Sequence, residues 1–405
     1  MRASAGPRNL VRTRAARSRR LAPCALLPQA DAAVIAARHL AEADAPLART
    51  LRARGRRVHP LRRRGAVLGH AVELERILPT TAQAKARWDA GEPVFLPGIL
   101  GDAPARHDAP IRACLRMFDR LRAGGSFLDE LEGRIGDDPD LRYAGSTVDK
   151  NDTREVERVF VDAELAGATV AKDLWAKLAW IANDESDRSL RIRFSAGLEQ
   201  LEEWMTATDL TAGWVDQFAL RAFPECRAIL GCEPLRALLA TLIPRPHRLS
   251  ERILYNNAPD GGAVFHHDAE PGQLGVCFSQ LEGSTAWLTL SKRRLARLLV
   301  RVGFARDERL AMQALDDTDD ERLWRLLNRD EAFTAQLAAH GALFVLHAGD
   351  SILLPSHGID DVAWHSVLAL GSKPSLAHSY GLFPRRADYT PAGDGWSAPA
   401  RAAVR

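Results

Sequence analysis

The stretch Phe265-His266-His267-Asp268, together with Trp364-His365 further along the chain, decides the expected fold and chemistry. Successive side chains of a β-strand point to opposite faces, so His266 and Asp268 would project to the same side. With an imidazole from a second strand, such a pair makes a two-histidine, one-carboxylate set. That set binds Fe(II) on one side and leaves the other coordination positions open. The pattern predicts that His266, Asp268 and His365 are metal ligands and form the catalytic centre.

Three other histidines, His347, His357 and His378, are alternatives for the distal ligand. We prefer His365 because it follows an aromatic residue and begins an apolar stretch, whereas His357 falls in an expected loop. His267 would point away from His266 on a regular strand, so we assign it to packing.

The composition is that of a globular protein. The chain has 405 residues, of which 46% are hydrophobic and 26% are charged, with a formal net charge of +3. No apolar run approaches the roughly 20 residues that a membrane span requires, so we expect no membrane association. The five cysteines are odd in number and irregularly spaced, which predicts reduced thiols in a cytoplasmic protein.

Positive charge gathers at the start of the chain. Residues 1–70 contain many arginines, no lysine and only three acidic residues, Asp31, Glu42 and Asp44. We expect a poorly ordered extension, because the segment has no interleaved aromatic residues and no recognisable DNA-reading helix. A transit peptide and a segment that binds nucleic acid through phosphate contacts are the alternatives.

The hydrophobic pattern predicts an α+β protein with a jelly-roll barrel, a helical N-terminal part and a helical insertion. Helices are expected within 31–55, 82–88 and 172–181, in a block at 196–242 and in an insertion at 291–340. Expected strands are 92–98, 156–164, 189–194, 252–257, 263–268, 274–281, 285–290, 343–347, 351–355, 363–370 and 376–383. Residues 71–385 would form the domain, and 386–405 a polar C-terminal tail.

Three motifs give these strands a family resemblance. They are Gly-Gly-x-x-x-His-x-Asp at 261–268, Gln-Leu-x-Gly-x-x-x-Trp at 280–287, and Gly-Asp-x-x-x-x-Pro at 349–355 followed by Trp364-His365. Together they resemble the JmjC-type, cupin-like oxygenases that use Fe(II) and 2-oxoglutarate, nearest in style to the ribosomal-protein and asparaginyl hydroxylases. The resemblance implies a double-stranded β-helix, Fe(II) and 2-oxoglutarate as cofactors, and hydroxylation of a protein side chain or small molecule by O2.

One position departs from the family pattern. Members commonly carry a lysine or arginine two residues before the tryptophan of the second motif, where it pairs with the distal carboxylate of 2-oxoglutarate, but this chain has Thr285. A buried carboxylate without a cation is costly, so another group must serve. Lys373 is the predicted replacement, with Lys292 and Arg385 as alternatives, and the hydroxyls of Thr285 and Tyr255 are predicted to hydrogen-bond the carboxylate.

Two other functions stay open at this point. Thr285 favours a cupin-type metalloenzyme that does not use 2-oxoglutarate, and the arginine-rich segment favours a non-catalytic protein that binds metal or polyanions. The helical segments at 196–242 and 291–340 are placed to shape access for a substrate or to form a homodimer contact.

Overall fold

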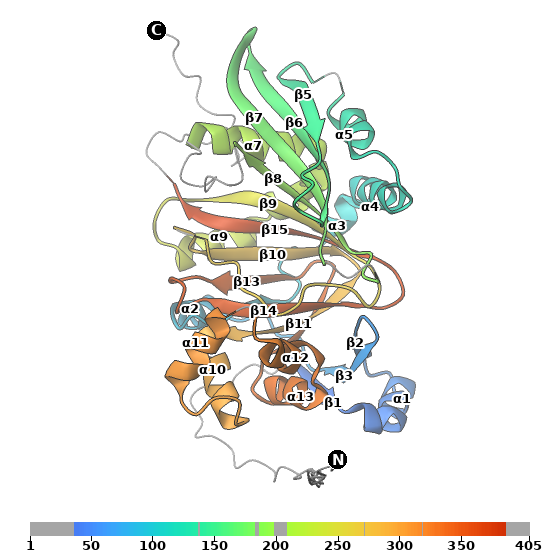
Figure 1. The fold of residues 1–405 in the computed structure, drawn as a ribbon, viewed down its shortest axis with the longest axis vertical. Coiled ribbons are helices and arrows are strands. Elements are labelled where there is room, and N and C mark those ends of the chain that lie inside the picture. The colour runs from blue at the N-terminus through green and yellow to red at the C-terminus, as the bar shows by residue number, and fades with distance from the viewer. Residues whose placement is uncertain are drawn as a thin grey trace, which may run out of the picture. The chain divides into compact units, whose positions relative to one another are not determined.

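The computed structural model describes residues 36–136, 138–182, 186–197, 209–270, 272–317 and 319–385. Its described part is an α+β arrangement of antiparallel sheets and helices, as predicted (Figure 1). The predicted tail at 386–405 lies outside the described residues. No helix in the described ranges is long and apolar enough to span a membrane.

The largest sheet has nine strands, and every neighbouring pair is antiparallel. The central strands β10 (Gly275–Glu282) and β15 (Ser375–Pro384) are buried along nearly their whole length, because side chains cover both faces. In spatial order the strands are β4 (Val94–Leu96), β13 (Ser351–Pro355), β10 (Gly275–Glu282), β15 (Ser375–Pro384), β9 (His247–Asn257), β8 (Leu190–Ala196), β7 (Ala168–Trp180), β6 (Glu155–Leu165) and β5 (Leu141–Thr147).

A second sheet of three strands faces part of the first. Its antiparallel order is β12 (Leu343–His347), β11 (Ser284–Ser291) and β14 (Ala363–Leu370). Apolar side chains from both sheets meet in one cluster, which includes Phe278 of β10 and Trp287 of β11. This sheet-on-sheet packing creates the space in which the candidate site lies.

Four helices between β11 and β12 confirm the predicted insertion at 291–340. They are α10 (Lys292–Arg301), α11 (Glu308–Asp316), α12 (Glu321–Arg329) and α13 (Glu331–Ala339). Each begins after a serine or aspartate whose side chain accepts a hydrogen bond from a backbone N–H of the first turn. Such N-caps define where helices begin.

The N-terminal part differs from the prediction. Residues 36–70 were expected to be poorly ordered or helical, but they contain β1 (Ala37–Leu40), η1 (Glu42–Asp44), α1 (Ala45–Ala53), β2 (Val58–Arg63) and the start of β3 (Ala66–Glu73). The three strands form a sheet of order β1-β3-β2. Buried Leu61 and Leu68 pack in the same cluster as Leu290 of β11 and Leu337 of α13, so burial outweighs the arginine-rich composition. Residues 1–35 lie outside the described ranges.

Helices line the other face of the nine-stranded sheet and share its large apolar cluster. They are α2 (Thr81–Asp89), α3 (Ala103–Arg106), α4 (Asp108–Arg122), α5 (Phe127–Ile135), α7 (Asp209–Ala222), η3 (Pro224–Cys226), α8 (Arg227–Leu230) and α9 (Glu233–Leu242). The predicted block at 196–242 is thus helical from 209 onward, while 198–208 lie outside the described residues. The helix expected at 172–181 is wrong, because that segment pairs with β6 and β8 as β7.

Candidate functional site

The segment around His266 lies along β14 instead of forming the regular strand that we predicted for 263–268. A single antiparallel bridge joins His266 to His365. Their backbones exchange two hydrogen bonds, of 2.9 Å and 2.8 Å, and the N–H of Val367 donates to the carbonyl of Ala263 at 2.9 Å. The pairing places the two histidines directly opposite each other.

Gly262 makes this close approach possible. Its φ is +123°, and a Cβ atom there would lie 2.3 Å from the carbonyl oxygen of Val367. Glycine tolerates both conditions because it has no side chain. The Gly261-Gly262 pair therefore sets the path of the chain into the site.

The side chains of His266, Asp268 and His365 converge. Nε2 of His266 lies 3.3 Å from Oδ1 of Asp268, and Nε2 of His365 lies 3.5 Å from Oδ2. The two imidazole centroids are 4.2 Å apart, and one ligand atom from each residue lies within 4.8 Å of the other two. Ligands about 2.1 Å from one metal ion at tetrahedral or octahedral angles would be roughly 3.0–3.4 Å apart, so the spacing fits a metal.

The orientation of His266 also suits a metal. Its Nδ1 lies 2.8 Å from the carbonyl oxygen of Val264, which requires a proton on Nδ1. In the neutral imidazole the lone pair is then on Nε2, the atom that faces Asp268. Side-chain exposure is 37% for His266 and 34% for Asp268 but only 4% for His365, so the group is open on one side.

The electrostatics favour the ligand forms of Asp268 and His365. Burial raises the pKa of Asp268, but His365 and His266 outweigh it and bring that pKa well below its usual value. Burial, together with His266, lowers the pKa of His365 to about 3. For His266, the attraction of Asp268 outweighs burial and raises the pKa above its ordinary value. An ionised carboxylate thus lies beside an imidazole that stays neutral.

A pocket opens over these residues, between the two facing sheets. Trp287 forms part of its wall and stacks on His365 with a centroid distance of 5.3 Å and an interplanar angle of 19°. Most of the lining is apolar, with a few converging polar groups, which is the usual character of a small-molecule site. The lining residues are Tyr255, Asn257, Ala263, His266, Asp268, Val276, Phe278, Trp287, His365, Val367 and Ser379.

The residues predicted to bind the cosubstrate are not all in this pocket. Tyr255 lines it. Thr285 is fully buried behind Trp287, and its hydroxyl donates to Oε1 of Gln280 at 2.9 Å and accepts from Nε1 of Trp287 at 3.1 Å. Lys373 is exposed in the turn between β14 and β15, away from the lining residues. Its position does not suit the role predicted for it, because it lies on the surface and outside the lining of the pocket.

The alternative lysine, Lys292, is fully buried at the start of α10. Its Nζ lies 2.6 Å from Oδ1 of Asp316 and 3.1 Å from the carbonyl oxygen of Ile359, and neither it nor Arg385 lines the pocket. Lys292 is therefore part of the support for the helical insertion.

Arg191 and Arg193 of β8 are two cations near the pocket that the sequence analysis did not single out, although neither is among its lining residues. Arg191 is paired with Tyr255 of β9 in the sheet register, so both side chains project to the pocket face. Both arginines are half-buried, and their charges act on the Tyr255 hydroxyl, with Arg191 also acting on His266. In the sequence, the alternation Leu-Arg-Ile-Arg-Phe at 190–194 could have indicated these two arginines, because it puts two cations on one face of a strand.

The other histidines have separate surroundings. His357 lies 3.0 Å from the carbonyl oxygen of Trp88, and His378 is fully buried near Glu225. His267 packs edge-on against Trp364 at 5.2 Å. None of these three lines the pocket.

No family model and no curated protein matches this sequence. Solved structures with similarity to the chain include the following three proteins. The non-heme alpha-ketoglutarate-dependent carbocyclase SnoK from nogalamycin biosynthesis is 12% identical, with a TM-score of 0.33, over 76% of this chain and 87% of that one. A 2OG-Fe(II) oxygenase family oxidoreductase from Burkholderia pseudomallei is 10% identical, with a TM-score of 0.31, over 81% and 97%. The ribosomal oxygenase YcfD from Escherichia coli is 15% identical, with a TM-score of 0.24, over 64% and 44%. Identities and TM-scores this low say nothing of function, so only the site itself can indicate what the protein does.

Proposed function

We propose that this chain is an Fe(II)- and 2-oxoglutarate-dependent oxygenase built on a double-stranded β-helix. His266, Asp268 and His365 are the proposed iron ligands. The observation that carries the proposal is the convergence of two imidazoles and one carboxylate at the base of a pocket, with one side of the group open. That donor set with open positions is typical of non-haem Fe(II) oxygenases.

Iron bound there would supply the redox centre at which O2 is activated as 2-oxoglutarate loses CO2 and becomes succinate. The protein residues have positioning roles. Val264 holds the tautomer of His266, and the stacked indole of Trp287 fixes the plane of His365. The apolar walls around Phe278 and Val367 keep water from the reacting groups.

Arg191, with Arg193 beside it, is the proposed partner of the distal carboxylate of 2-oxoglutarate. A guanidinium can bind a carboxylate through two parallel hydrogen bonds, and a partly buried position strengthens the attraction. The hydroxyl of Tyr255, opposite Arg191 in the sheet, is placed to donate a further hydrogen bond. These three residues take the role that Lys373 was predicted to have.

The proposed substrate is a protein side chain or a small molecule whose reacting carbon enters the pocket beside the open side of the metal group. The exposure of His266 and Asp268 supports access from that side. The alternative is a metalloenzyme of the same fold that does not use 2-oxoglutarate, which the buried, fully hydrogen-bonded Thr285 favours.

The test loads the protein with Fe(II) under anaerobic conditions, measures 2-oxoglutarate binding, then admits O2 and measures succinate. We expect Fe(II) bound in the pocket, 2-oxoglutarate binding that depends on that iron, and succinate above a metal-free control. His266→Ala should lose the pocket's equivalent of Fe(II), and with it the 2-oxoglutarate binding and the succinate. His267→Ala is the matched control, because its ring packs on Trp364 outside the pocket, and it should retain them.

Iron binding without 2-oxoglutarate binding or succinate would favour the alternative enzyme. Equal iron binding by wild type and His266→Ala would contradict the ligand assignment.

A further inference from the structure

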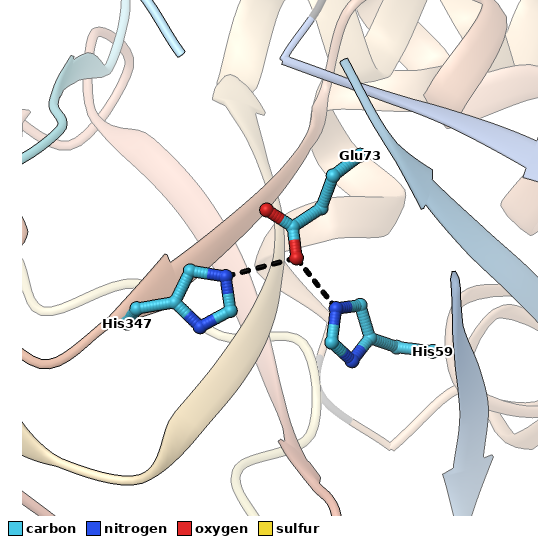
Figure 2. Close-up of side chains that lie close together, drawn as sticks. All are labelled: His59, Glu73 and His347. Carbon is cyan, nitrogen blue, oxygen red and sulfur yellow. Dashed lines mark hydrogen bonds and ion pairs between the residues drawn. The ribbon is translucent and has the colours of Figure 1, made fainter. Parts of the chain in front are cut away.

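A second group of two histidines and one carboxylate lies where the N-terminal sheet meets β12. His59 comes from β2, Glu73 from the end of β3 and His347 from the end of β12. Figure 2 shows the three side chains pointing toward one another. Nε2 of His59 and Nε2 of His347 lie at hydrogen-bond distances of 2.5 Å and 2.9 Å from the same oxygen, Oε1 of Glu73. These distances are shorter than the roughly 3.0–3.4 Å between two ligands of one ion, so a bound ion would move the imidazoles and the carboxylate slightly apart. None of the three lines the pocket described above.

The carboxylate of this group is buried. The side chain of Glu73 is only 5% exposed, and both imidazoles contact one of its oxygens. Arg57 is 3.9 Å from Oε2 with a side chain that is 65% exposed, and such a pair contributes little. A buried anion of this kind is stabilised by a closely bound positive charge.

His347 is oriented as metal-binding histidines usually are. Its Nδ1 lies 2.6 Å from the hydroxyl of Ser284, and its Nε2 faces Glu73. A ring N–H held by an oxygen on the far side fixes the tautomer and directs the other nitrogen to a metal. Because a serine hydroxyl can either donate or accept, Ser284 suits the group with or without a metal.

The group is also reachable from solvent. The side chains of His59 and His347 are 23% and 20% exposed, so water can supply a further ligand. One ligand atom from each of the three residues lies within 4.8 Å of the other two. Two imidazole nitrogens, one carboxylate oxygen and a water make a four-coordinate set that suits Zn²⁺.

We propose that His59, Glu73 and His347 form a second metal site, which takes a divalent transition-metal ion of the Zn²⁺ type and ties β2 and β3 to β12. The three ligands come from two different sheets, so the ion joins the N-terminal sheet to the barrel. Its role is structural, because its ligands are separate from those of the pocket.

The test titrates full-length protein, made without a polyhistidine tag and stripped by a chelator, with Co²⁺ and separately with Zn²⁺. Wild type should bind two equivalents of the metal ion. Each of the single variants Glu73→Gln and His266→Ala should bind one equivalent, and the double variant that carries both substitutions should bind none. The equivalent that remains in His266→Ala should give the intense visible absorption of four-coordinate Co²⁺. Adding Glu73→Gln to His266→Ala should raise the Kd for Co²⁺ at this remaining site by more than about 100-fold, which appears as a loss of binding in the titration.

His266→Ala isolates the proposed site, because it removes the pocket ligand and leaves His59, Glu73 and His347 intact. This protein therefore tests the proposal even if Glu73→Gln does not fold. Zn²⁺ should raise its thermal midpoint, since a ligand that binds only the folded state stabilises it, and should not raise that of the double variant. His107→Ala, at the junction of α3 and α4, is the control and should keep both equivalents.

The proposal is overturned if His266→Ala binds no Co²⁺, or if Glu73→Gln retains both equivalents. Neither result bears on the pocket, whose own test is iron-dependent 2-oxoglutarate binding and succinate formation by wild type.

Discussion

His266 and His365 are joined by backbone hydrogen bonds, which do not depend on any ligand of their side chains. The N–H of each donates to the carbonyl of the other, at 2.9 Å and 2.8 Å, and this is an isolated bridge rather than part of a longer ladder. The spacing of the two imidazoles therefore depends on a short stretch of pairing. That stretch continues only through Ala263 and Gly261, whose carbonyls accept from Val367 and Ala369.

Gly262→Ala should disturb this pairing. The new Cβ would meet the carbonyl oxygen of Val367 at 2.3 Å, at a φ of +123° that alanine rarely adopts. We expect a loss of about 1–3 kcal/mol in the free energy of unfolding, measured by denaturant titration, together with weaker Fe(II) binding. Gly272→Ala is the control, since its φ is also positive but nothing lies within 4 Å of the added atom. If Gly262→Ala binds iron as wild type does, the bridge does not set the ligand spacing.

Arg191→Ala should weaken 2-oxoglutarate binding without affecting iron. A hydrogen bond to a charged group contributes about 1.5–3 kcal/mol, so the Kd for 2-oxoglutarate should rise by roughly 10- to 100-fold. Calorimetry on the anaerobic Fe(II) protein measures both affinities. Lys373→Ala, in an exposed turn, should leave both unchanged. The reverse result, with Lys373 important and Arg191 not, would restore the assignment predicted from the sequence.

Asp216 of α7 should make stability depend on pH. Burial raises its pKa to about 6, against the opposing attraction of Arg252 and Arg248. The folded protein thus keeps the proton on Asp216 to a higher pH than the unfolded chain does, because in the unfolded chain the pKa of this carboxyl has its ordinary value of 3.8. Stability from this group is therefore present at low pH and is lost as pH rises from about 4 to about 6.

Asp216→Asn cannot titrate and isolates this effect. Relative to Asp216→Asn, the free energy of unfolding of wild type should fall by about 1.4 kcal/mol between about pH 5 and about pH 7.5. Denaturant titrations of both proteins at the two pH values measure the difference. A constant difference would mean that Asp216 stays ionised throughout.

Arg63→Met should destabilise the protein because Arg63 is fully buried and supports the segment that leads to His266. Its guanidinium donates to Oδ1 of Asn328 at 2.9 Å, to the carbonyls of Ala263 and Val367 at 3.1 Å and 3.2 Å, and to the hydroxyl of Ser366. Buried acceptors left without a donor cost about 1–3 kcal/mol each, so we expect a loss of several kcal/mol by thermal or denaturant unfolding. Arg62→Met is the control, since that neighbouring side chain is exposed, and an equal loss there would contradict the argument.

The sequence predicted several strands of the two facing sheets well, because their patterns are strong and local. Expected strands at 343–347, 351–355 and 363–370 coincide with β12, β13 and β14. The Gly-Gly turn and the His-x-Asp spacing also led to three side chains that do converge, although through a bridge rather than a regular strand.

What the sequence did not show depends on contacts between distant segments. The residues of β7 contain alanines and lysines that favour a helix, yet pairing with both β6 and β8 makes the segment a strand. The arginine-rich composition of residues 36–70 did not indicate a sheet, although this segment forms one whose apolar residues pack on the insertion helices. Arg191 was missed because no local motif indicates that β8 lies beside the pocket.

Because Arg63 is buried, the folded part of this protein begins before residue 71. A shortened protein that starts at Ala71, where the ordinary composition begins, would lack β2 and the guanidinium that donates hydrogen bonds to Ala263, Ser366 and Val367, near His266 and His365. It would also lack His59. An N-terminal deletion that looks like the removal of an unstructured leader would therefore disturb the proposed metal site, and an inactive product would say nothing about the chemistry of the intact chain.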